Sequence, residues 1–131
     1  KLLACTDILL PNEHECELIT GVRIRDEYSA EEAVRAILRM GVPQAVITLG
    51  GEGCVYNDGE TVCREPARKT RVVDTTAAGD CFAGALAVAL CEGKSIREAV
   101  RFATAASSVA VSRSGAQPSL PTRAEADAVL G

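Results

Sequence analysis

The sequence predicts an α/β fold in which helices and strands form layers around a largely parallel sheet. Two observations predict it. Short apolar runs bounded by turn residues alternate along the chain with longer segments that begin at polar helix caps. The sequence also contains no internal repeat, low-complexity tract or linker. Strands that are separated by helices usually pair in parallel.

The expected strands are short apolar runs whose ends carry turn residues. Pro11 stops the first strand, the glycine-rich segment GGEG turns the chain after the buried run AVITL, and Asp58-Gly59 makes a hairpin turn. In chain order these strands cover residues 7–10, 45–49, 54–57, 60–63 and 71–73.

Four expected helices begin with the spacing of a capping box. The pairs are Asn12/Glu15, Ser29/Glu32, Ser95/Glu98 and Thr122/Glu125. We expect these helices to run from Asn12 to Thr20, over residues 30–40, from Ser95 to about Ser112 and onward from Thr122. Glycines end the first two, at Gly21 and Gly41. By local physics alone, Asn12 and Glu15 are therefore a helix cap.

Composition limits the class of protein. The 131 residues, 47% of them hydrophobic, are enough for one packed domain or part of one. The net charge of −4 predicts neither nucleic acid nor an anionic membrane as a partner, and the longest apolar run, residues 81–91, is too short to cross a bilayer. The chain starts at Lys1 with no methionine or signal segment, so we expect a fragment or a processed product.

The six cysteines are scattered without a CxxC pair, and the single histidine, His14, cannot complete a zinc site with them. They indicate reduced, mostly buried thiols in a cytoplasmic protein. A two-residue turn at Asp58-Gly59 would place Cys54 opposite Cys63. Either a disulfide or two small apolar neighbours would fit that arrangement.

A fifth helix, expected from about Gly79, begins differently. Residues 75–79 are all small, and the residues after Asp80 predict a helix that is apolar all round and therefore buried. Its first N–H groups then need a partner. Ala77, Ala78 and Gly79 would let a phosphate approach those groups at the positive end of the helix dipole. The segment therefore favours an anion site.

Asp80 follows directly and has two interpretations. As a carboxylate at a helix start it would stabilise the helix dipole by about 0.3–1 kcal/mol. As a general base it would take the proton of a substrate hydroxyl while that oxygen attacks the γ-phosphoryl group of a nucleotide. The backbone donors would then stabilise the charge on the transferring group. The residues alone leave both interpretations open.

Four segments together resemble the ribokinase-like carbohydrate kinases, in the order and spacing of that family: LLPNEHECELITG, VITLGGEG, DTTAAGDCFAGALA and SRSGAQPS. The last segment is nearer to the ribokinase branch than to fructokinases or adenosine kinases. The resemblance covers essentially the whole chain but only the C-terminal half of the family. It implies a layered α-β-α fold with a mostly parallel sheet, here without the N-terminal half and the lid. Residues 1–131 would be the nucleotide-binding and catalytic-base part of one sugar-kinase domain.

The resemblance also implies a role for each matching position. Asp80 would be the catalytic base, with Ala77, Ala78 and Gly79 forming the anion hole. The nucleotide would contact Asn12, Thr48, Gly50, Gly51, Glu52, Gly53, Gly79, Asp80 and Thr104, the last near the adenine. Glu15 would act on Mg²⁺ largely through water, because this cation gives up its water shell reluctantly.

A monovalent-cation site, for potassium, is implied beside the anion hole. Its groups would be Asp74, the carbonyl of Thr76, and the segment with Ala110, Arg113, Gly115 and Ser119. A bound cation would hold these peptide groups in place and so preorganise the anion hole. Alternatively, Gly115 belongs to a simple turn and Asp74 caps a loop.

The implied reaction is the ATP-dependent phosphorylation of a sugar hydroxyl, D-ribose to ribose 5-phosphate in the ribokinase branch. Two alternatives stay open. One is a non-catalytic nucleotide-binding module, and the other is a kinase of the same family acting on fructose, 2-keto-3-deoxygluconate or adenosine. The sugar-binding half is missing, so we expect this chain to be inactive by itself. Its expected partners are ATP, a small sugar and the missing half, and homodimerisation of the full-length protein is left open.

Overall fold

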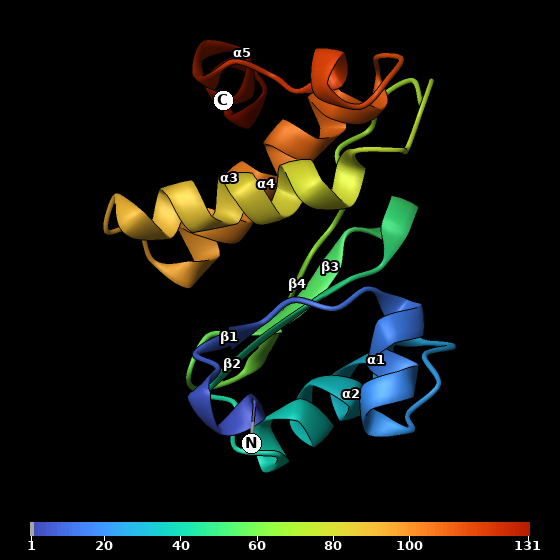
Figure 1. The fold of residues 1–131 in the computed structure, drawn as a ribbon, viewed down its shortest axis with the longest axis vertical. Helices are drawn as coiled ribbons and strands as arrows, with labels where there is room; N and C mark the ends of the chain where they lie inside the picture. The colour runs from blue at the N-terminus through green and yellow to red at the C-terminus, as the bar shows by residue number, and fades with distance from the viewer. Residues whose placement is uncertain (1) are drawn as a thin grey trace. The chain divides into compact units, whose positions relative to one another are not determined.

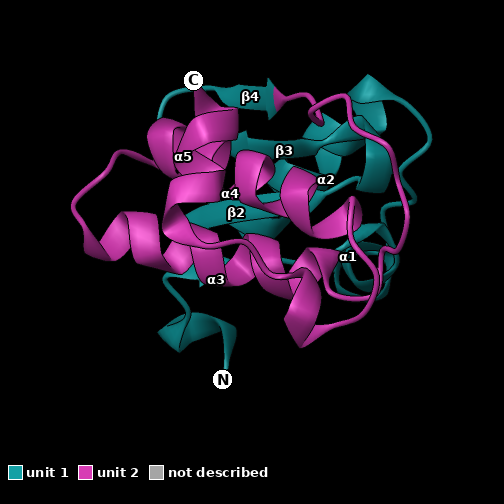
Figure 2. Ribbon diagram, turned by 90° about the horizontal axis from the view of Figure 1, so that it is seen from above, with its two compact units in different colours: residues 1–64 teal, residues 65–131 magenta. Residues whose placement is uncertain are grey.

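The computed structural model describes residues 2–131. The chain divides into two compact units, residues 1–64 (unit 1) and residues 65–131 (unit 2) (Figure 1; Figure 2). Unit 1 contains helices and strands, whereas in unit 2 every regular element after Glu65 is a helix or a 3₁₀ turn. The α/β class is confirmed, and the strands all lie toward the N-terminal half of the chain.

Unit 1 is a small mixed sheet with two α-helices. Its elements are a 3₁₀ turn (Leu3–Cys5), β1 (Ile8–Leu9), α1 (Glu13–Thr20), α2 (Glu27–Arg39), β2 (Gln44–Thr48), a 3₁₀ turn (Gly50–Glu52), β3 (Cys54–Asn57) and β4 (Val62–Glu65), which runs to the start of unit 2. The strand order is β1-β2-β3-β4. Figure 1 shows α1 and α2 together on one side of these strands.

The expectation of a largely parallel sheet is wrong for this chain. β1 and β2 pair in parallel, with Ile8 beside Gln44, but β2 and β3 are antiparallel, with Thr48 beside Cys54. The reason is the connection. Two helices separate β1 from β2, whereas a five-residue glycine-rich turn joins β2 to β3 and reverses the chain direction.

The core of unit 1 lies between α2 and the sheet. Val34 and Ile37 on α2 and Ile47 on β2 are fully buried in one apolar cluster. A buried asparagine, Asn57, closes the end of β3 against the start of β2: its side-chain oxygen accepts the N–H of Ala45 at 2.7 Å. A buried polar group needs a hydrogen-bond partner, and this bond joins the end of β3 to the start of β2.

The second helix begins three residues earlier than expected. Its cap is Asp26, not Ser29: Asp26 Oδ1 accepts the Ser29 N–H at 2.8 Å, and Ser29 Oγ accepts the Asp26 N–H at 3.0 Å. This reciprocal pair satisfies the first donors of α2 one turn before Ser29 could cap it. Glu32, the expected partner of Ser29, instead forms an ion pair with Arg39 at 2.5 Å.

The hairpin turn is displaced by one residue. The Asp58 carboxylate accepts the N–H groups of Glu60 and Thr61 at 3.0 and 2.8 Å, and the Asp58 N–H donates to the Thr61 carbonyl. The turn therefore centres on residues 59–60, because the aspartate side chain captures the loop donors. The expected register of Cys54 opposite Cys63 is lost, and the Cys63 thiol donates to Asp58 at 3.4 Å.

Unit 2 consists of α3 (Ala78–Cys91), α4 (Ile96–Val111), a 3₁₀ turn (Gln117–Ser119) and α5 (Arg123–Leu130). Figure 1 shows α3 and α4 running side by side, with α5 against α4. The expected caps of α4 and α5, Ser95 with Glu98 and Thr122 with Glu125, are confirmed as reciprocal capping boxes. So is the cap of α1, Asn12 with Glu15, followed by Gly21 in the left-handed conformation.

Two expectations for unit 2 are wrong. Residues 71–73 form no strand in the described chain: Val73 N–H donates to the Val111 carbonyl at the end of α4, and its side chain is 51% exposed. The long helix α3 is also not buried all round. Cys81, Phe82, Leu86 and Ala89 are buried, but the opposite face is exposed, because α4 covers only one side.

Candidate active site

The start of α3 differs from every other α-helix start in residues 2–131. The other four carry a capping box, whereas α3 has Ala77 at its N-cap and no side-chain cap. A methyl group cannot accept a hydrogen bond, so the orphan donors of this helix start lack the usual partner. Ala78 N–H donates to the Thr75 carbonyl at 3.2 Å, and a Cβ on Gly79 would meet no heavy atom within 4 Å.

Asp80 lies in the first turn of this uncapped helix and is exposed. No hydrogen bond or ion pair from residues 2–131 engages its carboxylate. Its neighbours in the turn differ in burial, since Ala77 is 6% exposed whereas Gly79 is open to solvent. The geometry thus combines a helix start that no side chain caps with an exposed carboxylate at the positive end of a helix.

The loop that leads into α3 is held by Asp74. One carboxylate oxygen accepts the Thr76 N–H at 2.9 Å and the Thr76 hydroxyl at 2.6 Å, and the other accepts the Gly115 N–H at 2.9 Å. These donors, the Thr76 hydroxyl foremost, lower the pKa of the Asp74 carboxyl from 3.8 to about 2. Asp74 therefore joins the entry of α3 to the loop after α4.

A second contact fixes the same helix start. Ser107, on α4, donates its hydroxyl to the Ala78 carbonyl at 3.2 Å. No sequence pattern could have indicated this residue, because the two partners are far apart in the chain and meet only when α3 packs on α4. The start of α3 is thus positioned by α4 and by the loop that follows it.

The other residues of the expected cation site, Ala110, Arg113 and Ser119, lie within ten residues of one another in the sequence. Each of them makes hydrogen bonds or ion pairs with nearby residues. The Ala110 carbonyl accepts the Arg113 N–H at 3.1 Å, and the Arg113 guanidinium pairs with Glu125. Ser119 is buried, and its hydroxyl donates to the Ala116 carbonyl. Of the expected set, the structure brings Asp74, Thr76 and Gly115 directly together.

The nature of the available ligands is informative. In residues 2–131, no three His, Cys, Asp or Glu side chains gather closely enough to hold a metal ion. In the expected set for a monovalent cation, the one carboxylate is that of Asp74. Oxygen donors of this kind suit hard cations rather than zinc or other thiophilic metals.

In unit 1, the segment after β1 meets the end of β2. Asn12 and Thr48 form a parallel bridge, and the Thr48 N–H donates to the Pro11 carbonyl at 3.0 Å. The Asn12 side chain accepts the Glu15 N–H at 2.9 Å, while Glu15 Oε2 accepts the Asn12 N–H at 2.9 Å. Both residues thus act as a helix cap at the carboxyl end of two parallel strands, which is where α/β folds bind ligands.

The glycine-rich segment follows the same strand end. Gly50 and Gly53 have φ angles of 54° and 99°, in the left-handed region that favours glycine. The Leu49 N–H donates to the Gly53 carbonyl at 2.8 Å, which closes the turn. Gly51 and Glu52 are exposed between these residues. The turn therefore presents backbone and one carboxylate to solvent beside Thr48.

Thr104, expected near the adenine, lies on α4 of unit 2. It is buried, and its hydroxyl donates to the Val100 carbonyl at 2.9 Å. The expected site residues thus divide between the units. Unit 1 carries residues 12, 15, 48 and 50–53, and unit 2 carries residues 74–80, 104 and 110–119.

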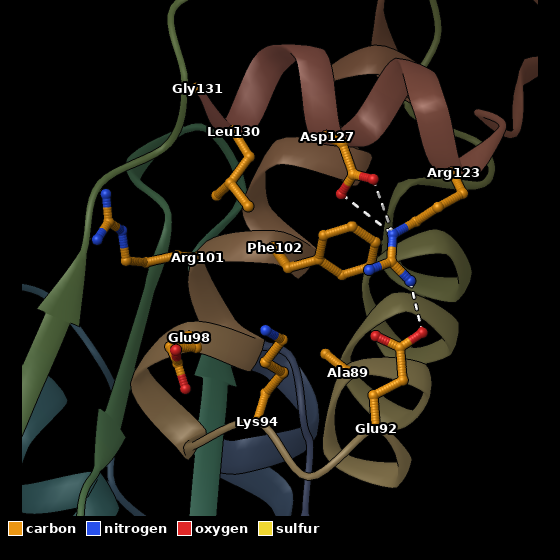
Figure 3. Close-up of a pocket in the computed structure, with 10 residues that line it drawn as sticks. All are labelled: Ala89, Glu92, Lys94, Glu98, Arg101, Phe102, Arg123, Asp127, Leu130 and Gly131. Carbon is orange, nitrogen blue, oxygen red and sulfur yellow. Dashed lines mark hydrogen bonds and ion pairs between the residues drawn. The ribbon is translucent and has the colours of Figure 1, made fainter.

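A pocket of about 300 Å³ lies elsewhere in unit 2, between the end of α3, the start of α4 and α5 (Figure 3). Arg123 is one of the residues that line it: it pairs with Glu92 at 2.5 Å and with Asp127 at 3.0 Å, and its Cζ lies 4.8 Å from the centre of the Phe102 ring. Glu92 is twelve residues after Asp80, roughly 18 Å along the helix. This pocket is therefore separate from the start of α3.

No helix in residues 2–131 combines the length and the apolar character that a membrane span requires.

Comparison with known proteins assigns the chain to a family. Residues 1–123 match the profile described as pfkB family carbohydrate kinase. The ribokinase of Haemophilus influenzae is 42% identical over 125 residues, a match that covers 95% of this chain and 41% of the relative. The chain therefore spans about two fifths of the length of this relative.

Solved structures of sugar kinases are also similar to this chain. The Arabidopsis thaliana ribokinase complexed with ribose and ATP has a TM-score of 0.92 and 40% identity, covering 98% of this chain and 42% of that structure. The Escherichia coli phosphofructokinase-2 in complex with potassium has a TM-score of 0.87 and 25% identity, with 98% and 42% covered. Both likenesses extend over essentially all of the present chain.

Proposed function

The chain belongs to the pfkB family of carbohydrate kinases, and on that premise we propose that it contributes the ATP site, the anion hole and the catalytic base of a ribokinase. The reaction is transfer of the γ-phosphoryl group of ATP to a primary hydroxyl of D-ribose, which gives ribose 5-phosphate and ADP. Ribokinases among the relatives support this choice of sugar. We assign the whole activity only to a protein that also contains the remaining three fifths of the family length.

The observation that carries the proposal is the start of α3, with an uncapped helix end and an available carboxylate in its first turn. Asp80 takes the proton of the sugar hydroxyl as its oxygen bonds to the γ-phosphorus. The bond between that phosphorus and the bridging oxygen of ADP breaks. The N–H groups of Ala77, Ala78 and Gly79 stabilise the charge on the transferring group, a role that backbone donors fill without reorganisation.

In unit 1, the nucleotide contacts are assigned to Asn12, Thr48, Gly50, Gly51, Glu52 and Gly53. Thr104 of unit 2 is assigned separately, to the adenine. Mg²⁺, when bound, neutralises charge on the β- and γ-phosphates. Glu15 uses Oε2 for its helix cap, which leaves Oε1 to accept a hydrogen bond from a water on that ion.

We assign a potassium ion to the loop that Asp74 organises. Its ligands would be the Asp74 carboxylate, the Thr76 carbonyl and the segment with Ala110, Arg113, Gly115 and Ser119. The low pKa of Asp74, about 2, keeps its carboxylate ionised at neutral pH. The ion would add to the hydrogen bonds that already hold residues 74–76 and 115 together, so its effect is to stiffen the entry of the anion hole.

The test replaces the matched region of the Haemophilus influenzae ribokinase with this chain and compares Asp80→Asn with Asp7→Asn in that chimera. Loss of a general base lowers turnover by about 10²–10⁴-fold. We expect that loss for Asp80→Asn, with ATP affinity measured by calorimetry nearly unchanged, and no loss for the exposed control Asp7. Turnover of Asp80→Asn equal to that of the unmodified chimera would remove the base assignment.

A further inference from the structure

Glu125 on α5 makes hydrogen bonds beyond the cap of its own helix. Its Oε2 accepts the N–H and the hydroxyl of Thr122 at 2.7 and 3.0 Å, which belongs to the cap of α5. Both carboxylate oxygens also accept the guanidinium of Arg113: Nη1 donates to Oε2 at 3.3 Å, and Nη2 donates to Oε1. Two-pronged contacts of this kind fix the orientation of a guanidinium as well as its position. Glu125 therefore joins α5 to the loop that follows α4.

The end of α4 and the loop after it hold the segment before α3 by three hydrogen bonds. The Val111 carbonyl accepts the N–H groups of Val73 and Asp74 at 2.7 and 3.2 Å. The Gly115 N–H donates to Asp74 Oδ2 at 2.9 Å. Asp74 Oδ1 in turn accepts the N–H and the hydroxyl of Thr76, one residue before the N-cap of α3. The entry of α3 therefore takes its position from the end of α4.

Arg113 connects these two sets of bonds. It lies midway between Val111 and Gly115 in the sequence, and its N–H donates to the Ala110 carbonyl at 3.1 Å. Its side chain, 36% exposed, ends at the carboxylate of Glu125. Contacts thus run continuously from α5 to the loop after α4 and on to the segment before α3.

We propose that Glu125 is a positioning residue for phosphoryl transfer, which rests on the proposed function of the start of α3. Its carboxylate holds Arg113, and with it the loop that bonds Asp74, so that residues 74–78 keep one arrangement before substrate binds. Donors that are already in place stabilise charge without reorganising at the moment of reaction. Glu125 follows Asp80 by 45 residues, and no sequence pattern links the two.

The expected effect of losing this carboxylate is local. The loop after α4 keeps its backbone bonds but holds the entry of α3 less tightly. The chemical step slows, because the donors of the anion hole are less often in place, whereas bound ATP and sugar keep their own contacts. The kcat therefore falls, and both KM values stay near those of the unmodified protein.

Glu125→Gln separates the two contacts of this residue. Glutamine also serves as the third residue of a capping box, so the cap of α5 is retained while the charge that pairs with Arg113 is removed. Asp127→Asn is the matched control, because it removes the same charge from the same helix. Asp127 pairs with Arg123 at 3.0 Å beside the pocket at the end of α3, and Arg123 keeps its second partner, Glu92 (Figure 3).

Hydrogen exchange of single amides, followed by NMR in the 131-residue chain, is the first test. In Glu125→Gln, the amides of Gly115 and Thr76 should exchange about fivefold faster relative to that of Ala103, a fully buried residue of α4. Asp127→Asn should leave these ratios unchanged. Equal acceleration at Gly115 and Ala103, or none at Gly115, would overturn the proposal, because Glu125 would then act on global stability or not at all.

Arg113→Gln removes the other partner of the same pair and tests whether the connection runs through it. If it does, the double variant Arg113→Gln with Glu125→Gln should accelerate exchange at Gly115 no more than the stronger single variant. Additive effects would contradict the proposal, because the two side chains would then act on the loop independently.

The Haemophilus influenzae chimera tests the link to the reaction. Glu125→Gln should lower kcat by about fivefold, in proportion to the exchange at Gly115, with both KM values within about twofold of the unmodified chimera. Asp127→Asn should leave kcat unchanged. An unchanged kcat in Glu125→Gln would refute the positioning role even if exchange is faster. Full turnover in Asp80→Asn would instead remove the proposed base, and the exchange data on the 131-residue chain would still report the loop connection separately.

Discussion

The two units of the chain differ in how far they bury apolar side chains and cap their helices. In unit 1, α2 and the sheet enclose a fully buried cluster, and both α-helices begin at reciprocal caps. In unit 2, α3 begins without a side-chain cap and exposes one apolar face. Unit 1 therefore caps its α-helices and buries its apolar cluster by itself, whereas α3 begins without a side-chain cap and exposes apolar residues. Such deviations from local rules are expected where a chain binds something.

The largest effect should come from the core of unit 1. Ile37 on α2 is fully buried, and Ile37→Ala removes apolar contacts and leaves a cavity, which costs about 2–5 kcal/mol. Val88→Ala on the exposed face of α3 should change stability by only about 0.5 kcal/mol or less in the 131-residue chain. Urea unfolding of both variants measures the difference. Equal costs would mean that the two regions are packed alike, contrary to the comparison.

A smaller effect should follow from removing a cap. Ser95 caps α4 by accepting the Glu98 N–H, and Ser95→Ala should cost about 1 kcal/mol. This variant makes the start of α4 resemble the uncapped start of α3. The exposed loop residue Ser114 provides the matched control, Ser114→Ala, for which we expect no measurable change in the urea midpoint. A neutral Ser95→Ala would show that capping does not distinguish the two helix starts.

The smallest effect is the acid response of the loop before α3. The folded pKa of Asp74, about 2, is below its ordinary 3.8. Its contribution is therefore complete above that ordinary value and is lost as the pH falls from about 4 toward 2. Glu125, whose pKa is lowered to about 2 mainly by its hydrogen bond to Arg113, titrates in the same window.

Acid titration followed by circular dichroism checks this prediction. Asp74→Asn should flatten the stability profile between pH 4 and 2 without abolishing it, because Glu125 still titrates there. Asp7→Asn, at an exposed position of unit 1, should leave the profile unchanged. An identical acid profile for Asp74→Asn and the unmodified chain would show that the carboxylate does not hold the loop.

Local chemistry explains which features of the fold could be predicted. The caps at Asn12, Ser95 and Thr122 and the end of α1 at Gly21 depend on residues within four positions of one another. The cap of α2 was misplaced because Asp26 offers a competing local partner for Ser29. Part of the candidate site could be predicted for the same reason, because Asp80 and the small residues before it are adjacent in sequence.

The sequence by itself determined the helices, most of the strands and the residues that mark the family. The tertiary structure alone decided that the sheet is mixed, that residues 71–73 are not a strand and that α3 exposes a face. It also decided that Asp74 bonds Gly115, 41 residues away, and that Ser107 reaches Ala78. The physical reason is range: caps and turns are satisfied by neighbours in the chain, whereas pairing direction, burial and loop contacts depend on which distant segments meet.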